Sequence, residues 1–173
     1  MSSLFDRLSS EAKPYEMAVG YTIQNQSNKY TYLPDINEMD YDVYLKSKCG
    51  KDVKIEVKVH EGVSPNGSPY ETLCLEVLEY QYRHDDYVQS HWMTADFDIM
   101  AHVDKNKGMI HFYKGSEIRA WAAARKHNAR YSKRVKTAYL IIPWKKREAG
   151  HMYSIRISET ILSQIGGTNE EKN

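Results

Sequence analysis

The chain has little of what usually reveals a function directly. It contains two cysteines, Cys49 and Cys74, in no metal-like spacing, so we expect neither a disulfide framework nor a zinc site, and a cytoplasmic location fits. No stretch approaches about 18 consecutive apolar residues, and the first residues lack the basic and apolar regions of a signal peptide. The sequence also has no Gly-rich phosphate loop and no Gly-x-Ser-x-Gly elbow, which argues against an NTP-driven enzyme and a serine hydrolase.

The composition is that of an ordinary globular protein. The 173 residues are 41% apolar and 27% charged, enough for one domain with its own core. We expect residues 1–165 to form a single domain. Residues 166–173 are polar and begin with two glycines, so they are expected to form a disordered tail.

Runs rich in β-branched and aromatic residues predict the strands. They are expected at residues 29–33, 41–47, 52–60, 72–80, 109–113, 137–143 and 152–157. The early strands should form an antiparallel meander, with a hairpin around Gly50 that sets Asp42 opposite Lys58 and Tyr44 opposite Glu56.

Helical spacing and capping residues predict the helices. A short helical turn is expected at the N-terminus, followed by a helix that begins near Pro14. Thr94 is expected to cap a second helix, and Ser116 a third that runs to about Asn128. Together these elements predict a mixed α/β (α+β) fold, a central sheet flanked by helices.

Strand alternation brings polar residues to one face of the predicted hairpin. Side chains alternate between the two faces of a strand, so Glu56 and Lys58 share the polar face of the strand at 52–60. Asp42 of the preceding strand falls on the same face. The strand at 72–80 is expected to place Glu76 opposite Glu56, so three carboxylates and one lysine would share a patch.

This grouping suits the hydrolysis of a phosphodiester. Mg²⁺ is usually held by one or two protein carboxylates together with substrate phosphate. A nearby lysine can orient water or offset charge that develops on phosphorus. We therefore predict a metal-dependent nuclease that uses Mg²⁺ or Mn²⁺, the structural alternative being a cross-strand salt bridge on an exposed sheet face.

Asp42, followed in the next strand by Glu56-Val57-Lys58, resembles the active-site signature of the PD-(D/E)xK nuclease superfamily. This superfamily includes restriction enzymes, Holliday-junction resolvases and phage exonucleases, and the resemblance covers mainly residues 14–80. It implies a restriction-endonuclease-like core in which Asp42 and Glu56 bind metal and Lys58 aids catalysis. The chain departs from the signature in having Tyr41, not proline, before Asp42.

The resemblance implies three further expectations. Many members add a glutamate from the first helix, and Glu16 fits that place, the alternative being a solubilising residue on the helix surface. Residues 72–97 resemble small phage-encoded members, which would act in the host cytoplasm. Resolvases and many restriction enzymes work as dimers, so a homodimer is compatible with the resemblance.

Positive charge is concentrated in one segment. Residues 114–147 hold eleven Lys and Arg against one acid, Glu117, so the segment carries +10 and the rest of the chain −9 of the net +1. Cations mixed with aromatic rings are typical of nucleic-acid surfaces. The residues predicted to contact DNA, with RNA left open, are Arg119, Arg125, Lys126, Arg130, Lys133, Arg134 and Lys136. The alternative functions are a non-catalytic nucleic-acid-binding module that uses this segment, and an interaction protein or inhibitor.

Overall fold

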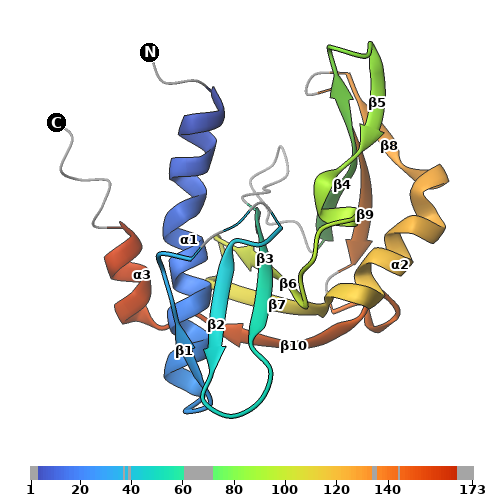
Figure 1. Ribbon diagram of the computed structural model, residues 1–173. Helices are drawn as coiled ribbons and strands as arrows, with labels where there is room; N and C mark the ends of the chain where they lie inside the picture. The colour runs from blue at the N-terminus through green and yellow to red at the C-terminus, as the bar shows by residue number, and fades with distance from the viewer. Residues whose placement is uncertain are drawn as a thin grey trace, which may run out of the picture.

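The computed structural model describes residues 4–36, 38, 40–60, 72–133, 136–143 and 145–166. These residues form two β-sheets flanked by α-helices, which confirms the predicted mixed α+β class (Figure 1). No helix in the described ranges is long and apolar enough to cross a membrane.

A six-stranded sheet forms the larger half of the fold. Its spatial order is β1-β2-β3-β6-β7-β10, and β3 and β6 run parallel whereas the other neighbours are antiparallel. The strands are β1 (Tyr30–Tyr32), β2 (Val43–Ser47), β3 (Val53–His60), β6 (Ile99–Asp104), β7 (Met109–Lys114) and β10 (His151–Arg156).

Two helices cover one face of this sheet, α1 (Leu4–Gln26) and α3 (Glu159–Gly166). Val19 of α1 and Ile161 of α3 pack with Ile55 and Val57 of β3 in one buried apolar cluster. This is the apolar face that strand alternation predicts for β3, so the polar face with Glu56 and Lys58 points to the other side.

A four-stranded sheet stands against that other side (Figure 1). Its order is β5-β4-β9-β8, made of β4 (Thr72–Gln81), β5 (Asp86–Gln89), β8 (Arg130–Ser132) and β9 (Thr137–Pro143). Helix α2 (Gly115–Arg125) packs Ile118 and Trp121 onto Leu75 and Leu140 of this sheet. Short 3₁₀ turns lie at His91–Met93 (η1), Lys126–Asn128 (η2) and Arg147–Ala149 (η3).

The β2–β3 hairpin forms as predicted, but its register is shifted by two residues. Tyr44 pairs with Lys54 rather than Glu56, and Leu45 pairs with Val53. Asp52 stabilises this register, because its carboxylate accepts hydrogen bonds from the Ser47 N–H at 2.8 Å and the Tyr44 hydroxyl at 2.5 Å. A two-residue shift leaves every side chain on its predicted face.

The expected pairing of the strand at 72–80 with the hairpin is wrong. β4 pairs with β5 and β9 in the second sheet, and the neighbour of β3 is β6, with Lys58 next to His102. Glu76 is therefore not a cross-strand partner of Glu56. The loop between β3 and β4 lies outside the described residues.

Two helix predictions also need correction. Thr94 follows the turn η1, and the segment predicted as its helix contains β6, whose residues from Met100 onward are buried. A strand covered on both faces shows no alternation, so its sequence resembles a buried helix. Helix α2 exists but begins at Gly115, after Lys114, without a side-chain cap from Ser116.

The two ends of the chain differ from prediction in smaller ways. α1 is one continuous helix with Pro14 inside it, not a turn followed by a new helix. Gly166, expected in the tail, ends α3, a helix that the sequence analysis did not predict. The remainder of the predicted tail, residues 167–173, lies outside the described residues.

Gly115 provides a test of how tightly α2 joins the loop before β6. A Cβ built at Gly115 would lie 2.8 Å from the carbonyl oxygens of both Phe97 and Asp98. Gly115→Ala is expected to lower the free energy of unfolding by about 1–3 kcal/mol, the usual cost of overpacking. Urea denaturation measures this, with exposed Ser116→Ala as the control. A Gly115→Ala protein as stable as wild type would show that the loop before β6 shifts to accommodate the added methyl group.

Candidate active site

Asp42 is fixed where β2 begins beside β3. Its backbone N–H donates to the Ile55 carbonyl at 2.9 Å, and its Oδ2 accepts from the Val57 N–H at 2.7 Å. Because these partners flank Glu56 on β3, the Asp42 carboxylate is held beside Glu56. The shifted hairpin register therefore brings the two acids closer than predicted.

Glu56 and Lys58 form an ion pair on the same face of β3. Glu56 Oε1 lies 2.6 Å from Lys58 Nζ. The Glu56 residue is only 9% exposed, whereas the Lys58 side chain is 38% exposed. The carboxylate is thus largely shielded from water, while the ammonium group can reach a ligand in the open space beside it.

That open space is a pocket of about 320 Å³ between the two sheets. Asp42, Glu56 and Lys58 line it from the β2–β3 side, and Glu76 lines it from β4. The remaining lining residues are Val59, Cys74, Leu75, Glu79, His91, Trp92 and His102. The indole N–H of Trp92 donates to the Glu76 carbonyl at 2.6 Å, which holds β4 in this wall. Four of the five predicted catalytic and metal-binding residues thus share one pocket.

The carboxylates of the pocket resist ionisation. Burial, offset by the Val57 N–H and Lys58, raises the pKa of Asp42. Burial and the charge of Asp42 raise the pKa of Glu56, against the opposing effect of Lys58. Burial against the pocket wall and the neighbouring Glu79 likewise raise the pKa of Glu76, whose residue remains partly open to solvent. A site of this kind favours an added positive charge.

Glu16 lies close by without lining the pocket. It projects from α1, where Lys13 Nζ lies 3.3 Å from its Oε2. Burial raises its pKa, and the charges of Asp42 and Glu56 add to the rise. Glu16 is therefore within electrostatic range of both pocket acids, but its near partner is Lys13.

The donor set suits Mg²⁺ or Mn²⁺. Asp42 and Glu56 offer carboxylate oxygens side by side, and hard cations commonly use one or two protein carboxylates with water and phosphate. Within the described ranges, no three His, Cys, Asp or Glu side chains are gathered closely enough to hold an ion by themselves. Glu76 and Glu16 thus do not complete a three-donor cluster in this arrangement.

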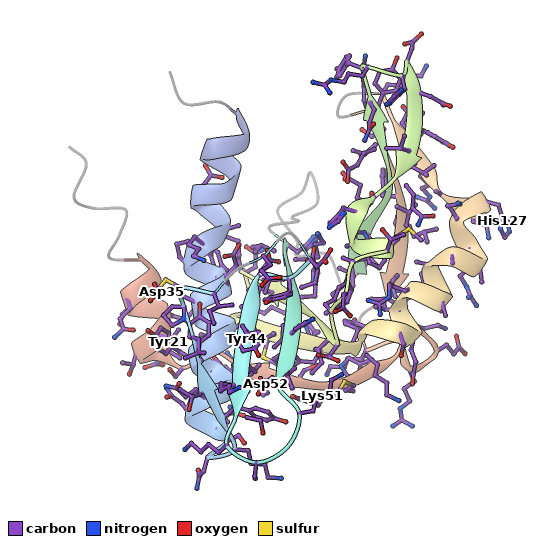
Figure 2. The ribbon with its side chains drawn as sticks, in the orientation of Figure 1. Tyr21, Asp35, Tyr44, Lys51, Asp52 and His127 are labelled. Atoms are coloured by element: carbon purple, nitrogen blue, oxygen red, sulfur yellow. The ribbon has the colours of Figure 1, made fainter. Side chains whose placement is uncertain are left out.

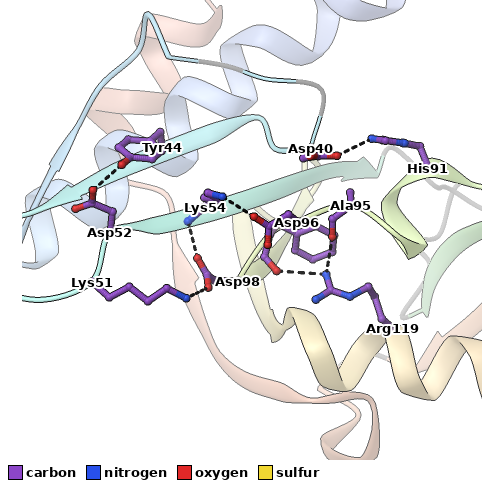
Figure 3. Close-up of polar contacts among 11 residues, drawn as sticks. Asp40, Tyr44, Lys51, Asp52, Lys54, His91, Ala95, Asp96, Asp98 and Arg119 are labelled. Carbon is purple, nitrogen blue, oxygen red and sulfur yellow. Dashed lines mark hydrogen bonds and ion pairs between the residues drawn. The ribbon is translucent and has the colours of Figure 1, made fainter.

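Two residues of the pocket wall, His91 and His102, are histidines that the sequence analysis did not link to the site. His102 is buried in β6 directly beside Lys58, and burial lowers its pKa well below the usual value. His91 follows β5, and its Nε2 lies 3.1 Å from Asp40 Oδ1, which joins the two walls (Figure 3). They were missed because the sequence of β6 resembles a helix and because β5, the strand before His91, was not predicted.

A set of ion pairs fixes β3 against the segment before β6 (Figure 3). Lys54 Nζ lies 2.6 Å from Asp96 Oδ2, and Lys51 Nζ lies 2.6 Å from Asp98 Oδ1. Asp98 Oδ2 also accepts the Lys54 N–H at 3.0 Å. These contacts hold the start of β3 against the segment before β6, and none of their residues lines the pocket.

The predicted nucleic-acid contacts divide between two faces of the four-stranded sheet. Arg119 donates to the Ala95 and Phe97 carbonyls at 3.3 Å, and Arg125 stacks over the Trp121 ring at 4.7 Å. Both belong to α2, on the face opposite to Glu76. Figure 2 shows His127, just after α2, far from Tyr44 and Asp52. Lys126, Arg130, Lys133 and Lys136 are exposed, and Arg134 lies outside the described residues.

Arg130 lies on the pocket side of the four-stranded sheet. Glu76 pairs with Tyr139, and Tyr139 pairs with Arg130, so the three residues form one row on the same face of the sheet. With neighbouring strands about 4.8 Å apart, Arg130 lies about 10 Å from Glu76 along this row. A polyanion that crosses the pocket can reach Arg130 without leaving this face.

The fold is similar to that of a solved bacterial homing endonuclease, I-Ssp6803I. The two structures superpose with a TM-score of 0.50 over 95% of this chain and 99% of that chain, at 13% sequence identity. No protein-family model matches the sequence, and no curated protein matches it. At this identity the likeness concerns the fold, and it agrees with the mixed α+β class predicted from the sequence.

Proposed function

We propose that the protein is a metal-dependent nuclease of the PD-(D/E)xK type that hydrolyses phosphodiester bonds in DNA. The observation that carries this proposal is the pocket between the sheets, where Asp42, Glu56 and Lys58 converge as the signature requires. The fold likeness to a protein named as a homing endonuclease supports it independently of those residues.

Each residue has a defined part in this proposal. Asp42 and Glu56 would hold Mg²⁺ or Mn²⁺, whose charge offsets the burial and mutual repulsion of the two carboxylates. When bound, such an ion acts as a Lewis acid on the phosphate. Lys58 keeps its ammonium group at the open side of Glu56, where it can stabilise negative charge developing on the phosphate oxygens.

Glu76 and Glu16 keep secondary parts in the proposal. Glu76 lines the same pocket from β4, where it would accept a hydrogen bond from a water molecule held by the ion. Glu16, paired with Lys13, adjusts the electrostatic field around Asp42 from α1.

Arg130 is expected to contribute to duplex binding on the pocket side. Arg130→Ala should weaken the affinity for a blunt DNA duplex and lower the salt slope of log K by about one, as expected for the loss of one phosphate contact. Fluorescence anisotropy over a range of salt concentrations measures both quantities. The control is Lys48→Ala, which removes an equal charge from the exposed turn after β2. If Arg130→Ala and Lys48→Ala had the same salt slope, Arg130 would not be a DNA phosphate contact.

A cleavage assay tests the function itself. Wild-type protein is incubated with plasmid, linear and branched DNA in Mg²⁺, in Mn²⁺ and in EDTA. We expect strand cleavage of at least one substrate with either metal and none in EDTA. Tight DNA binding with no cleavage under either metal would favour the non-catalytic binding module instead.

A further inference from the structure

Four tyrosines form a connected cluster at the end of the four-stranded sheet, and none of them lines the pocket. The ring of Tyr80 lies 5.1 Å from that of Tyr82 and 5.3 Å from that of Tyr87, and Tyr87 lies 5.1 Å from Tyr131, all edge to face. They come from β4, the turn after it, β5 and β8. Lys136 completes the cluster, with its Nζ 4.6 Å from the Tyr80 ring centre and 4.4 Å from that of Tyr82. We call these five residues the tyrosine platform.

The sheet geometry explains how residues on opposite edge strands meet. Tyr131 pairs with Ala138, and Leu78 pairs with Ala138 from the other side. The small alanine side chain leaves room for the Tyr131 ring to lean across β9 toward Tyr87. Tyr80, two residues beyond Leu78, lies on the same face and pairs with Tyr87. The platform therefore occupies the α2 side of the sheet, opposite to Glu76 and Arg130.

The platform is ordered yet open to solvent. The Tyr80 hydroxyl donates to Asp85 in the β4–β5 turn, which fixes the central ring. Tyr82 remains 76% exposed and Tyr131 60% exposed, the two largest values among the large hydrophobic side chains of the described residues. Rings of this size cost free energy to leave in water, so an arranged and exposed set points to a ligand.

The chemistry of the platform indicates what kind of ligand it fits. Exposed tyrosine faces stack on nucleic-acid bases without regard to sequence, and a lysine beside them can pair with phosphate. Lys136 is exposed over the rings, and Lys133 is exposed in the adjoining turn. Bases inside a duplex have their faces covered by neighbouring bases, whereas unpaired bases present theirs. The arrangement therefore favours unpaired nucleotides over an intact duplex.

We propose that the tyrosine platform binds unpaired nucleotides of the DNA substrate, with bases stacked on Tyr82 and Tyr131 and phosphate paired with Lys136. This inference rests on the proposed nuclease function and narrows its substrate class to DNA with a single-stranded segment. Tyr82 lies six residues beyond Glu76, about 20 Å along an extended strand. The unpaired segment would thus be held on the α2 side while the phosphodiester to be cut lies on the pocket side.

Equilibrium binding tests the platform without relying on cleavage. Fluorescence anisotropy is measured in EDTA with a blunt duplex, the same duplex with a single-stranded tail, and the tail alone. Wild type is compared with Tyr82→Ala and Tyr131→Ala, while Tyr82→Phe keeps the ring and serves as the matched control. Thermal melting confirms that each variant is folded, as expected for exposed side chains.

We expect each alanine variant to lose roughly 5- to 150-fold in affinity for the tailed duplex and the tail, the factor associated with stacking one base on an aromatic ring. Affinity for the blunt duplex should not change, and Tyr82→Phe should bind like wild type. Equal losses of affinity for blunt and tailed DNA, or no loss for either, would contradict the proposal that the tyrosine platform binds unpaired nucleotides. A wild type that binds these probes but never cleaves DNA would instead reject the proposed nuclease activity.

Discussion

Lys58→Ala is expected to lower the rate of DNA cleavage by about 10²- to 10³-fold, the usual loss when a group that stabilises transition-state charge is removed. Glu56→Gln should lower it at least as much, because it removes one of the two carboxylates proposed to hold the metal. Glu56 is buried and its partner Lys58 lies 2.6 Å away, so each substitution removes one charge from a defined pair. Single-turnover cleavage at saturating protein measures the chemical step.

The matched control for these variants is Lys54→Ala. Lys54 lies on the same face of β3 but pairs with Asp96 and does not line the pocket. It should retain cleavage close to that of wild type, and circular dichroism should show that all three variants are folded. If Lys58→Ala cleaved as fast as Lys54→Ala, Lys58 would have no part in the chemistry.

Divalent metal is expected to raise the thermal stability, and to do so more strongly at higher pH. At a Mg²⁺ concentration of about 100 times Kd, binding to the folded state adds about 2.7 kcal/mol, which is about 5–10 °C in Tm for a domain of this size. This gain in Tm should depend on pH, because burial raises the pKa values of Asp42 and Glu56.

The direction of that pH effect follows from the raised pKa values. Below the ordinary values of 3.8 for Asp42 and 4.5 for Glu56, the two groups are neutral in both the folded and the unfolded protein. As pH rises through the raised pKa values of the folded state, metal-free protein loses stability, because ionisation is easier in the unfolded chain. Bound metal offsets this loss, so the Tm gain should be larger near pH 8 than near pH 5.

Glu56→Gln separates metal binding from general salt effects. A neutral amide removes the buried charge, so in EDTA near neutral pH this variant should melt on the order of a few degrees above wild type. The Tm gain from Mg²⁺ should be lost in the same variant. Differential scanning fluorimetry with Mg²⁺ and with EDTA measures both effects. An equal Mg²⁺ gain in wild type and Glu56→Gln would place metal binding elsewhere.

The core of the candidate site could be predicted because it depends on local rules. Asp42, Glu56 and Lys58 lie on two strands joined by one short hairpin, and a register error of two residues does not change which face a side chain takes. The structure brings all three into one pocket. Alternation along two neighbouring strands was therefore sufficient.

The rest of the site depends on long-range packing. Glu76 does line the pocket, but from a second sheet that faces β3 rather than as the next strand of a meander. His102 was not connected with Lys58, because β6 is buried on both faces and its sequence resembles a helix. Composition located the basic segment but could not show that Arg130 and Arg125 lie on opposite faces of one sheet.

One measurement tests the central claim most directly: binding and cleavage of a labelled DNA, followed together in Mg²⁺ for wild type and for a protein carrying both Asp42→Asn and Glu56→Gln. These changes keep the size of both side chains and an acceptor for the Val57 N–H. The account predicts that wild type binds and cleaves, whereas the double variant binds the DNA and leaves it intact. Cleavage by the double variant at the wild-type rate would contradict it, as would a wild type that binds DNA and cleaves none.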